Sequence, residues 1–141
     1  MAHRPMTPFL RNVLRIDAVL SGLTALVMLA DAEPLAEWTG LPAGTLRSVG
    51  AMLIPWTGLL AWLASRATVP TAAVAAVIVL NIDWAIGCAL AAFGIIGSPQ
   101  GMGTAMLAAQ ALGTLVLADL EWLGLRRAGR PATMRAGALA S

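Results

Sequence analysis

Hydrophobic residues fall into four long runs along the chain, and most polar and turn-forming residues lie between them. The runs cover residues 9–30, 46–65, 71–96 and 102–125. Each has about the length that an α-helix needs to cross the hydrocarbon core of a bilayer. The pattern therefore predicts an all-α fold, a four-helix transmembrane bundle that occupies residues 1–128. The basic stretch 129–141 is predicted to be a flexible tail.

The segments between the runs predict how the helices are connected. Residues 31–45 are acidic and rich in turn formers, and they predict one helical turn on the membrane surface. Residues 66–70 and 97–101 are short turns, so the helices that flank each turn are expected to lie antiparallel. Pro55 lies inside the second run and predicts a kink, which we favour over the binding site that a broken helix can form.

Composition and charge agree with a membrane protein. The chain is 59% hydrophobic and 11% charged, whereas a soluble domain carries about 25% charged residues. The nine basic residues are all arginines, and on one side of the predicted membrane there is only Arg47. By the positive-inside rule, both termini and the 66–70 turn are expected in the cytoplasm, with the helices in a bacterial inner membrane.

The first run also allows a different interpretation. A basic start, a short apolar region and the sequence Ala30-Asp31-Ala32 resemble a secretory signal with its cleavage site. Asp17 interrupts that apolar region, and we therefore favour a membrane span over a signal peptide.

Four charged residues lie toward the predicted cytoplasmic ends of the first and fourth runs. They are Arg15, Asp17, Asp119 and Glu121. At about 1.5 Å per helical residue, these side chains share one membrane level. We expect an ion-paired cluster that ties the first helix to the fourth, and favour it over a proton or ion path because structural pairs are commoner.

A second group of residues, Asn81, Asp83, Trp84 and Gln110, is predicted nearer the middle of the membrane. Asn81 and Asp83 point roughly 200° apart on a helix, and Asn81 is expected to hydrogen-bond with Gln110. Asp83 has no basic residue at its predicted depth. It is therefore expected to be protonated and hydrogen-bonded, to face a wet cavity, or to pair across a subunit interface. Trp84, like Trp56, suits packing or, beside a buried carboxylate, a cationic or aromatic ligand.

Several function classes are disfavoured. Cys88 is the single cysteine and His3 the single histidine, so an internal disulfide cannot form and a haem or copper site is not expected. No catalytic set, phosphate loop or metal-ligand spacing is present, so we expect no cofactor and no enzymatic activity. The expected partners are the lipid bilayer and either a second copy of the chain or another membrane protein, with no role for nucleic acid. Ala109 and Gly113 are spaced for close helix packing.

The chain resembles small four-helix bacterial inner-membrane proteins of unassigned function. The likeness lies in residues 15–22 (RIDAVLSG), 81–84 (NIDW) and 121–127 (EWLGLRR), and it implies a fold but no chemistry. A small multidrug transporter also has a carboxylate in its first span, where Asp17 stands, but its other residues do not match. The sequence therefore favours a non-enzymatic accessory component of the membrane. The alternative is a small proton-coupled transporter that uses Asp83 or Asp17, and the distinguishing feature is whether an aqueous cavity reaches those carboxylates.

Overall fold

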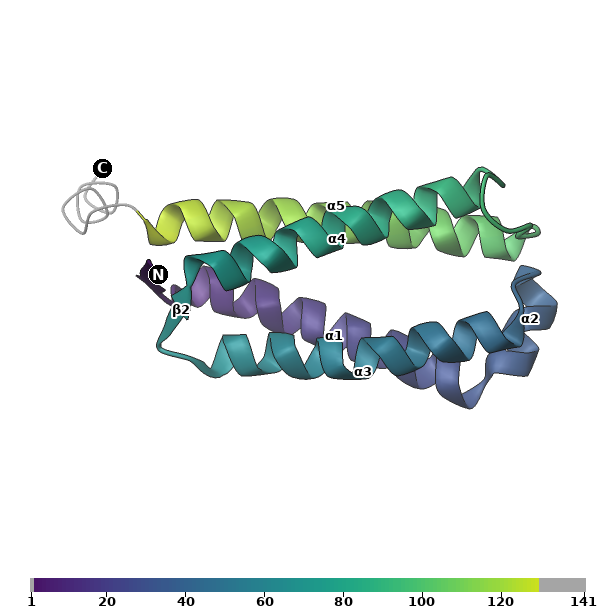
Figure 1. Ribbon diagram of the computed structural model, residues 1–141, viewed down its shortest axis with the longest axis horizontal. Helices are drawn as coiled ribbons and strands as arrows, with labels where there is room; N and C mark the ends of the chain where they lie inside the picture. Colours follow the sequence, from purple (N-terminus) through teal and green to yellow (C-terminus); the bar gives the residue numbers. More distant parts are fainter. Residues whose placement is uncertain (1, 130–141) are drawn as a thin grey trace.

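Four long helices, one short helix and two short strands make up residues 2–129, the part of the chain that the computed structural model describes (Figure 1). The elements are β1 (His3–Pro5), α1 (Pro8–Ala30), α2 (Ala32–Thr39), α3 (Ala43–Ser65), β2 (Thr68–Pro70), α4 (Thr71–Ala92) and α5 (Met102–Ala128). The helices α1, α3, α4 and α5 are each long and apolar enough to cross a membrane. The predicted all-α fold with four such helices is confirmed.

The helix ends differ from the predicted ends by a few residues. The helix α4 ends at Ala92, earlier than predicted, and Gly94 follows with a φ of 71°, a left-handed conformation that suits glycine. The helix α5 instead continues to Ala128. The connector after α1 forms α2, a helix of 8 residues that is followed by Gly40, where φ is also 71°. The predicted tail lies outside the described residues from position 130 onward.

The N-terminal arm, for which no partner was predicted, is tied to the turn between α3 and α4. The strand β1 pairs antiparallel with β2, with Arg4 opposite Val69. The side chain of Arg4 also donates a hydrogen bond to the carbonyl of Leu125 at 3.1 Å. The start of the chain, the β2 turn and the end of α5 therefore lie at one end of the molecule, here called the β end (Figure 1).

The long helices form two antiparallel pairs, α1 with α3 and α4 with α5, and the pairs meet mainly where α1 contacts α5 (Figure 1). Near the β end all four long helices share one core, to which the buried side chains of Leu14, Leu60, Val77 and Leu125 belong. In the half nearer α2, the second core contains side chains only from α1, α2 and α3. The two pairs are thus packed together near the β end and separate toward the other end.

The far end is closed again by the short helix α2. The carbonyl oxygen of Thr39 accepts a hydrogen bond from the backbone nitrogen of Gln100 at 2.9 Å. Gly103 lies so close that a Cβ there would come within 2.1 Å of the same oxygen. The absence of a side chain at Gly103 therefore lets the start of α5 dock on α2, and the space between the pairs is bounded at both ends.

Candidate functional site

A cavity of about 810 Å³ lies where the two helix pairs separate, and all four long helices contribute to its walls. Most of the lining is apolar, with leucines, methionines and the tryptophans Trp56 and Trp84. Among residues 2–129, Asp17 and Asp83 are the only charged side chains that line it. A cavity of this size and composition is typical of sites for small molecules, which have apolar walls and a few polar groups.

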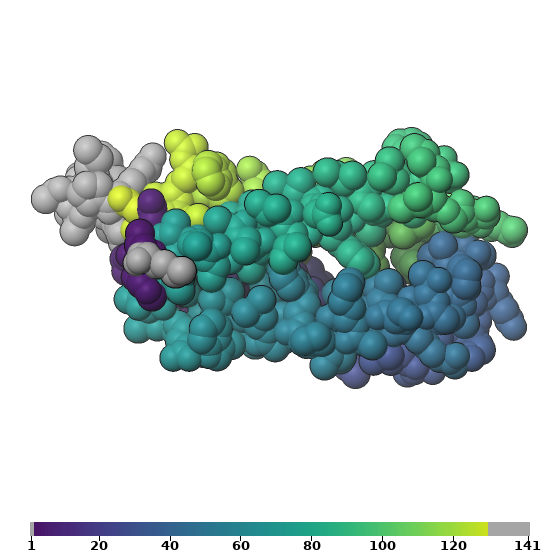
Figure 2. All heavy atoms as spheres, viewed as in Figure 1, coloured from purple at the N-terminus to yellow at the C-terminus, as the bar shows by residue number. Residues whose placement is uncertain are grey.

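The cavity opens sideways, between α3 and α4. The backbones of these two helices come close to each other almost nowhere, and the molecular surface is hollowed between them (Figure 2). The lining side chains Met52 and Leu80 are 55% and 50% exposed, and Asp83 is also exposed. The opening therefore faces the surroundings of the bundle along its long side, at the level of the apolar helices.

At one side of the cavity, an amide joins two buried carboxyl groups. The Nδ2 atom of Asn81 donates hydrogen bonds to Asp17 Oδ2 at 3.0 Å and to Glu121 Oε2 at 3.1 Å. Ser21 donates a third bond, to Asp17 Oδ1, at 3.1 Å. Asp17, Asn81 and Glu121 are 3%, 4% and 0% exposed. These three residues, here called the carboxyl cluster, join α1, α4 and α5, and only Asp17 and Asn81 reach the cavity wall.

The carboxyl cluster has a different composition from the predicted ion-paired cluster. Asp17 and Glu121 do come together, but Arg15 and Asp119 lie exposed on the outer surface of the bundle. Within residues 2–129 the structure has one ion pair, between Arg47 and Glu33, far from this site. The reason is the helical turn of about 100° per residue, which points Arg15 away from Asp17 and Asp119 away from Glu121.

One carboxyl oxygen of the cluster has no partner. Glu121 Oε1 is buried and accepts no hydrogen bond from the described residues, and no basic side chain contacts Asp17 or Glu121 there. Both carboxyl groups lie within hydrogen-bond distance of the same nitrogen, so two negative charges here would repel each other strongly. The cluster can therefore hold a proton or respond to a cation nearby.

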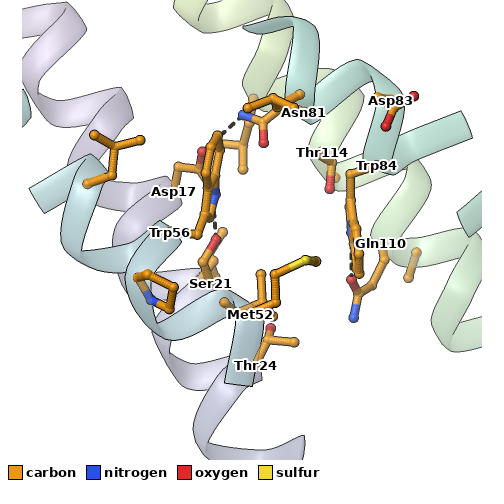
Figure 3. Close-up of a pocket in the computed structure, with 18 of the residues that line it drawn as sticks. Asp17, Ser21, Thr24, Met52, Trp56, Asn81, Asp83, Trp84, Gln110 and Thr114 are labelled. Atoms are coloured by element: carbon orange, nitrogen blue, oxygen red, sulfur yellow. Dashed lines mark hydrogen bonds between the residues drawn. The ribbon is translucent and has the colours of Figure 1, made fainter. Parts of the chain in front are cut away.

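The second predicted group is also arranged differently. Asn81 does not bond to Gln110; instead, the Nε1 atom of Trp84 donates to Gln110 Oε1 at 3.3 Å. Figure 3 shows Trp84 and Gln110 on one side of the cavity and Trp56, beside Asp17, on the other. Two indole rings thus form opposite walls, one of them next to a carboxyl group.

Asp83 lies at the edge of the cavity and, among the described residues, has no hydrogen bond or ion pair. The structure places Asp83 exposed at this edge, and the three environments predicted for it stay predictions. The helix α3 is uninterrupted through Pro55, which lines the same cavity. Cys88 is buried on the face of α4 that carries Asn81.

Ser21, Thr24 and Thr114 also line the cavity (Figure 3) and were not predicted as site residues. For Ser21 and Thr114, the spacing along the helix could have predicted this position. Ser21 follows Asp17 by one helical turn, and Thr114 follows Gln110 in the same way, so each shares a helix face with a predicted residue. No group of three His, Cys, Asp or Glu side chains in the described part of the chain is arranged for a metal ion.

No protein-family model matches the chain, and no similar curated protein or solved structure was found. The function is therefore argued from the geometry of the cavity.

Proposed function

We propose that this protein is a small, non-enzymatic transporter of the bacterial inner membrane, with both termini in the cytoplasm. In this proposal it carries a small solute through the cavity and exchanges protons at the carboxyl cluster. Four apolar helices and the placement of the arginines support the membrane location and orientation. The sequence alone favoured an accessory component, and the cavity is the reason to prefer the alternative.

The observation that carries the proposal is that one cavity reaches both Asp17 and Asp83. A helix bundle with a purely structural role would gain packing energy by closing over this space, because the side chains on its walls would then contact one another. Carboxyl groups inside a membrane are costly, and they are typical of substrate and proton pathways. An apolar cavity with carboxyl groups on its wall is thus better explained by a ligand than by packing.

Proton exchange follows from the chemistry of the carboxyl cluster. With one carboxyl protonated and one ionised, Asn81 can donate to both and the repulsion between two charges disappears. A solute that enters beside Asp17 changes the balance, and the proton can then leave. Besides Asp17, Asp83 is the only charged described residue that lines the cavity, and α3 contributes none to that lining. Cys88 is buried on the face of α4 that carries Asn81, and Asp119 and Arg15 are exposed outside the cavity.

Reconstituted vesicles with a trapped pH dye test this proposal. Three probes with one aromatic body are added in turn: naphthylmethyl-trimethylammonium, naphthylmethanol and naphthalenesulfonate. At least one should trigger proton movement in the wild type, and the signal should vanish in Asp17→Asn and in Glu121→Gln, because an amide cannot release a proton. The control Asp119→Asn changes a carboxylate outside the cavity and should behave as the wild type does. Silence of all three probes in the wild type would overturn the proposal.

Reporter fusions test the orientation. Fusions after Ala43 and after Ser98 should report the periplasmic side, and a fusion after Arg66 should report the cytoplasm. A cytoplasmic signal from the Ala43 fusion would contradict the proposed topology. Recovery of a protein that begins at Glu33 would instead support cleavage of a signal peptide.

A further inference from the structure

We propose that the ligand of the cavity is an organic cation with an aromatic or otherwise apolar body, bound with its charge beside Asp17. This inference names the substrate class and rests on the proposed function. It depends on three features of the site: the sign of the charges on the wall, the character of the walls, and the sideways opening.

The charge on the wall selects the sign of the ligand. In the described part of the chain, both charged residues that line the cavity, Asp17 and Asp83, are acidic, and no arginine lines it. Attraction between unit charges is several times stronger in a site with few polar groups than in bulk water. An organic anion would meet two acidic groups and no cation, so the cavity disfavours it. A cation beside Asp17 supplies the positive charge that Asp17 and Glu121 lack in the carboxyl cluster.

The walls select an apolar body. Trp56 and Trp84 line opposite sides (Figure 3), and the face of an indole ring attracts a cation or stacks on an aromatic ring. Met52 and Met106 add flexible, polarizable surface to the same cavity, and methionine adapts to ligands of varied shape. A small inorganic cation would leave most of this apolar surface unfilled, whereas an aromatic cation would cover it.

The sideways opening fits an amphipathic ligand. The apolar side chains of Leu59 on α3 and Leu80 on α4 line the cavity and are 41% and 50% exposed. Asp83 is the exposed polar group on the same wall. A ligand with one charged end and an apolar body can therefore place its charge at Asp17 while its body contacts the walls and the apolar margin. The cavity thus has a carboxyl group at its inner side and another at its edge, with apolar surface between them.

Binding measurements with two matched probes test the inference. Wild-type protein in nanodiscs of phosphatidylcholine is dialysed against naphthylmethyl-trimethylammonium or naphthylmethanol, with empty nanodiscs subtracted. The cation should bind at least about tenfold more tightly than the alcohol, because only the cation interacts with the carboxyl group and with the indole faces by charge. In Asp17→Asn this preference should fall to about threefold or less, while Asp119→Asn should keep it in full.

Two glycine substitutions, one inside the cavity and one outside it, test the cavity independently of the carboxyl cluster. A Cβ at Gly113 would have nothing within 4 Å, and Gly113 lines the cavity, so Gly113→Phe should fill the space without disturbing the helix contacts. It should abolish binding of both probes. Gly58 has the same free space but lies outside the cavity lining, and Gly58→Phe should bind as the wild type does.

The outcomes separate this inference from the proposed function. Equal binding of both probes, blocked by Gly113→Phe, would overturn the cation and leave the cavity as a ligand site. Cation binding that survives both Asp17→Asn and Gly113→Phe would place the probe elsewhere and overturn the inference. If neither probe nor naphthalenesulfonate bound the wild type, the proposed function would fail together with the inference.

Discussion

The two halves of the bundle contain the same four long helices but pack them differently. Near the β end, branched side chains such as Leu14 and Leu60 from all four long helices interlock, and both are 0% exposed. In the other half, the face of α5 toward the α1–α3 pair carries small residues, including Ala109 and Gly113, which line the cavity. The same helix therefore packs against the α1–α3 pair at one end and leaves space at the other.

This difference explains why the carboxyl cluster lies where it does. Asp17, Asn81 and Glu121 occupy the boundary between the closed core and the cavity: Ala18 and Ala118, close to them in sequence, belong to the closed core, while Ser21 lines the cavity. The closed core fixes the three helices that hold the cluster, and the cavity would give Asp17 access to the ligand that we propose. Rigid support on one side and open space on the other are what a binding group requires.

The largest expected effect separates two leucines of α1. Leu14 is 0% exposed in the closed core, and Leu20 is 50% exposed on the cavity wall. Leu14→Ala should lower the free energy of unfolding by about 2–5 kcal/mol, because the closed core cannot collapse around the lost volume. Leu20→Ala should cost clearly less, since space already surrounds it. Thermal unfolding in detergent measures both, and equal losses would contradict the division into a closed and an open half.

The next largest effect compares the side-chain amides of Asn81 and Gln110. Asn81→Leu removes the one hydrogen bond that Glu121 accepts through its side chain and one of the two that Asp17 accepts. Leaving such groups unpaired should cost about 1–3 kcal/mol. Gln110→Leu removes a single bond from Trp84, worth about 0.6 kcal/mol in measured membrane cases. A larger loss of thermal stability in Gln110→Leu than in Asn81→Leu would refute the central position of Asn81.

A smaller effect distinguishes two glycines of α5. A Cβ at Gly124 would lie 3.0 Å from Leu10 Cδ1 and 3.2 Å from its Cβ, whereas Gly113 has nothing within 4 Å. Gly124→Ala should therefore destabilise the closed half by about 1 kcal/mol through overpacking. Gly113→Ala should be neutral or slightly stabilising, because alanine favours the helix by up to about 1 kcal/mol over glycine. The comparison fails if both variants unfold at the same temperature.

The four long helices could be predicted from the sequence because hydropathy over about 20 residues is a strong signal. Local details could not be predicted from hydropathy. The β1–β2 pairing depends on the folded bundle, which brings the arm beside the β2 turn, and no local pattern encodes that meeting. The close spacing of Ala109 and Gly113 predicted helix contact, but small residues permit either contact or space. Which of the two occurs depends on the side chains that face them.

The site could be predicted by depth but not by direction. Asp17 and Glu121 were correctly placed at one level along the bundle, and Asn81 lies at that same level, because its amide bonds to both. The error lay in rotation about the helix axis. The argument that separates Asn81 from Asp83, about 200° for two residues, applies equally to Arg15 and Asp17. Which member of each pair, Arg15 or Asp17 and Asp119 or Glu121, is buried against a neighbouring helix can be known only from the tertiary structure.

The smallest expected effect tests that rotation directly. Had Arg15 paired with the buried carboxyl groups, Arg15→Ala would destabilise the protein more than Arg47→Ala. Arg15 is exposed and makes no ion pair with any residue that the structure describes, while Arg47 of α3 pairs with Glu33 of α2 at the surface. Exposed ion pairs contribute about 0–1 kcal/mol, so Arg47→Ala should cost a few tenths of a kcal/mol and Arg15→Ala no more than that. Unfolding in detergent at low and high salt checks both, since screening should reduce the Arg47 effect. A loss of several kcal/mol in Arg15→Ala alone would return Arg15 to the carboxyl cluster and require a different rotation of α1.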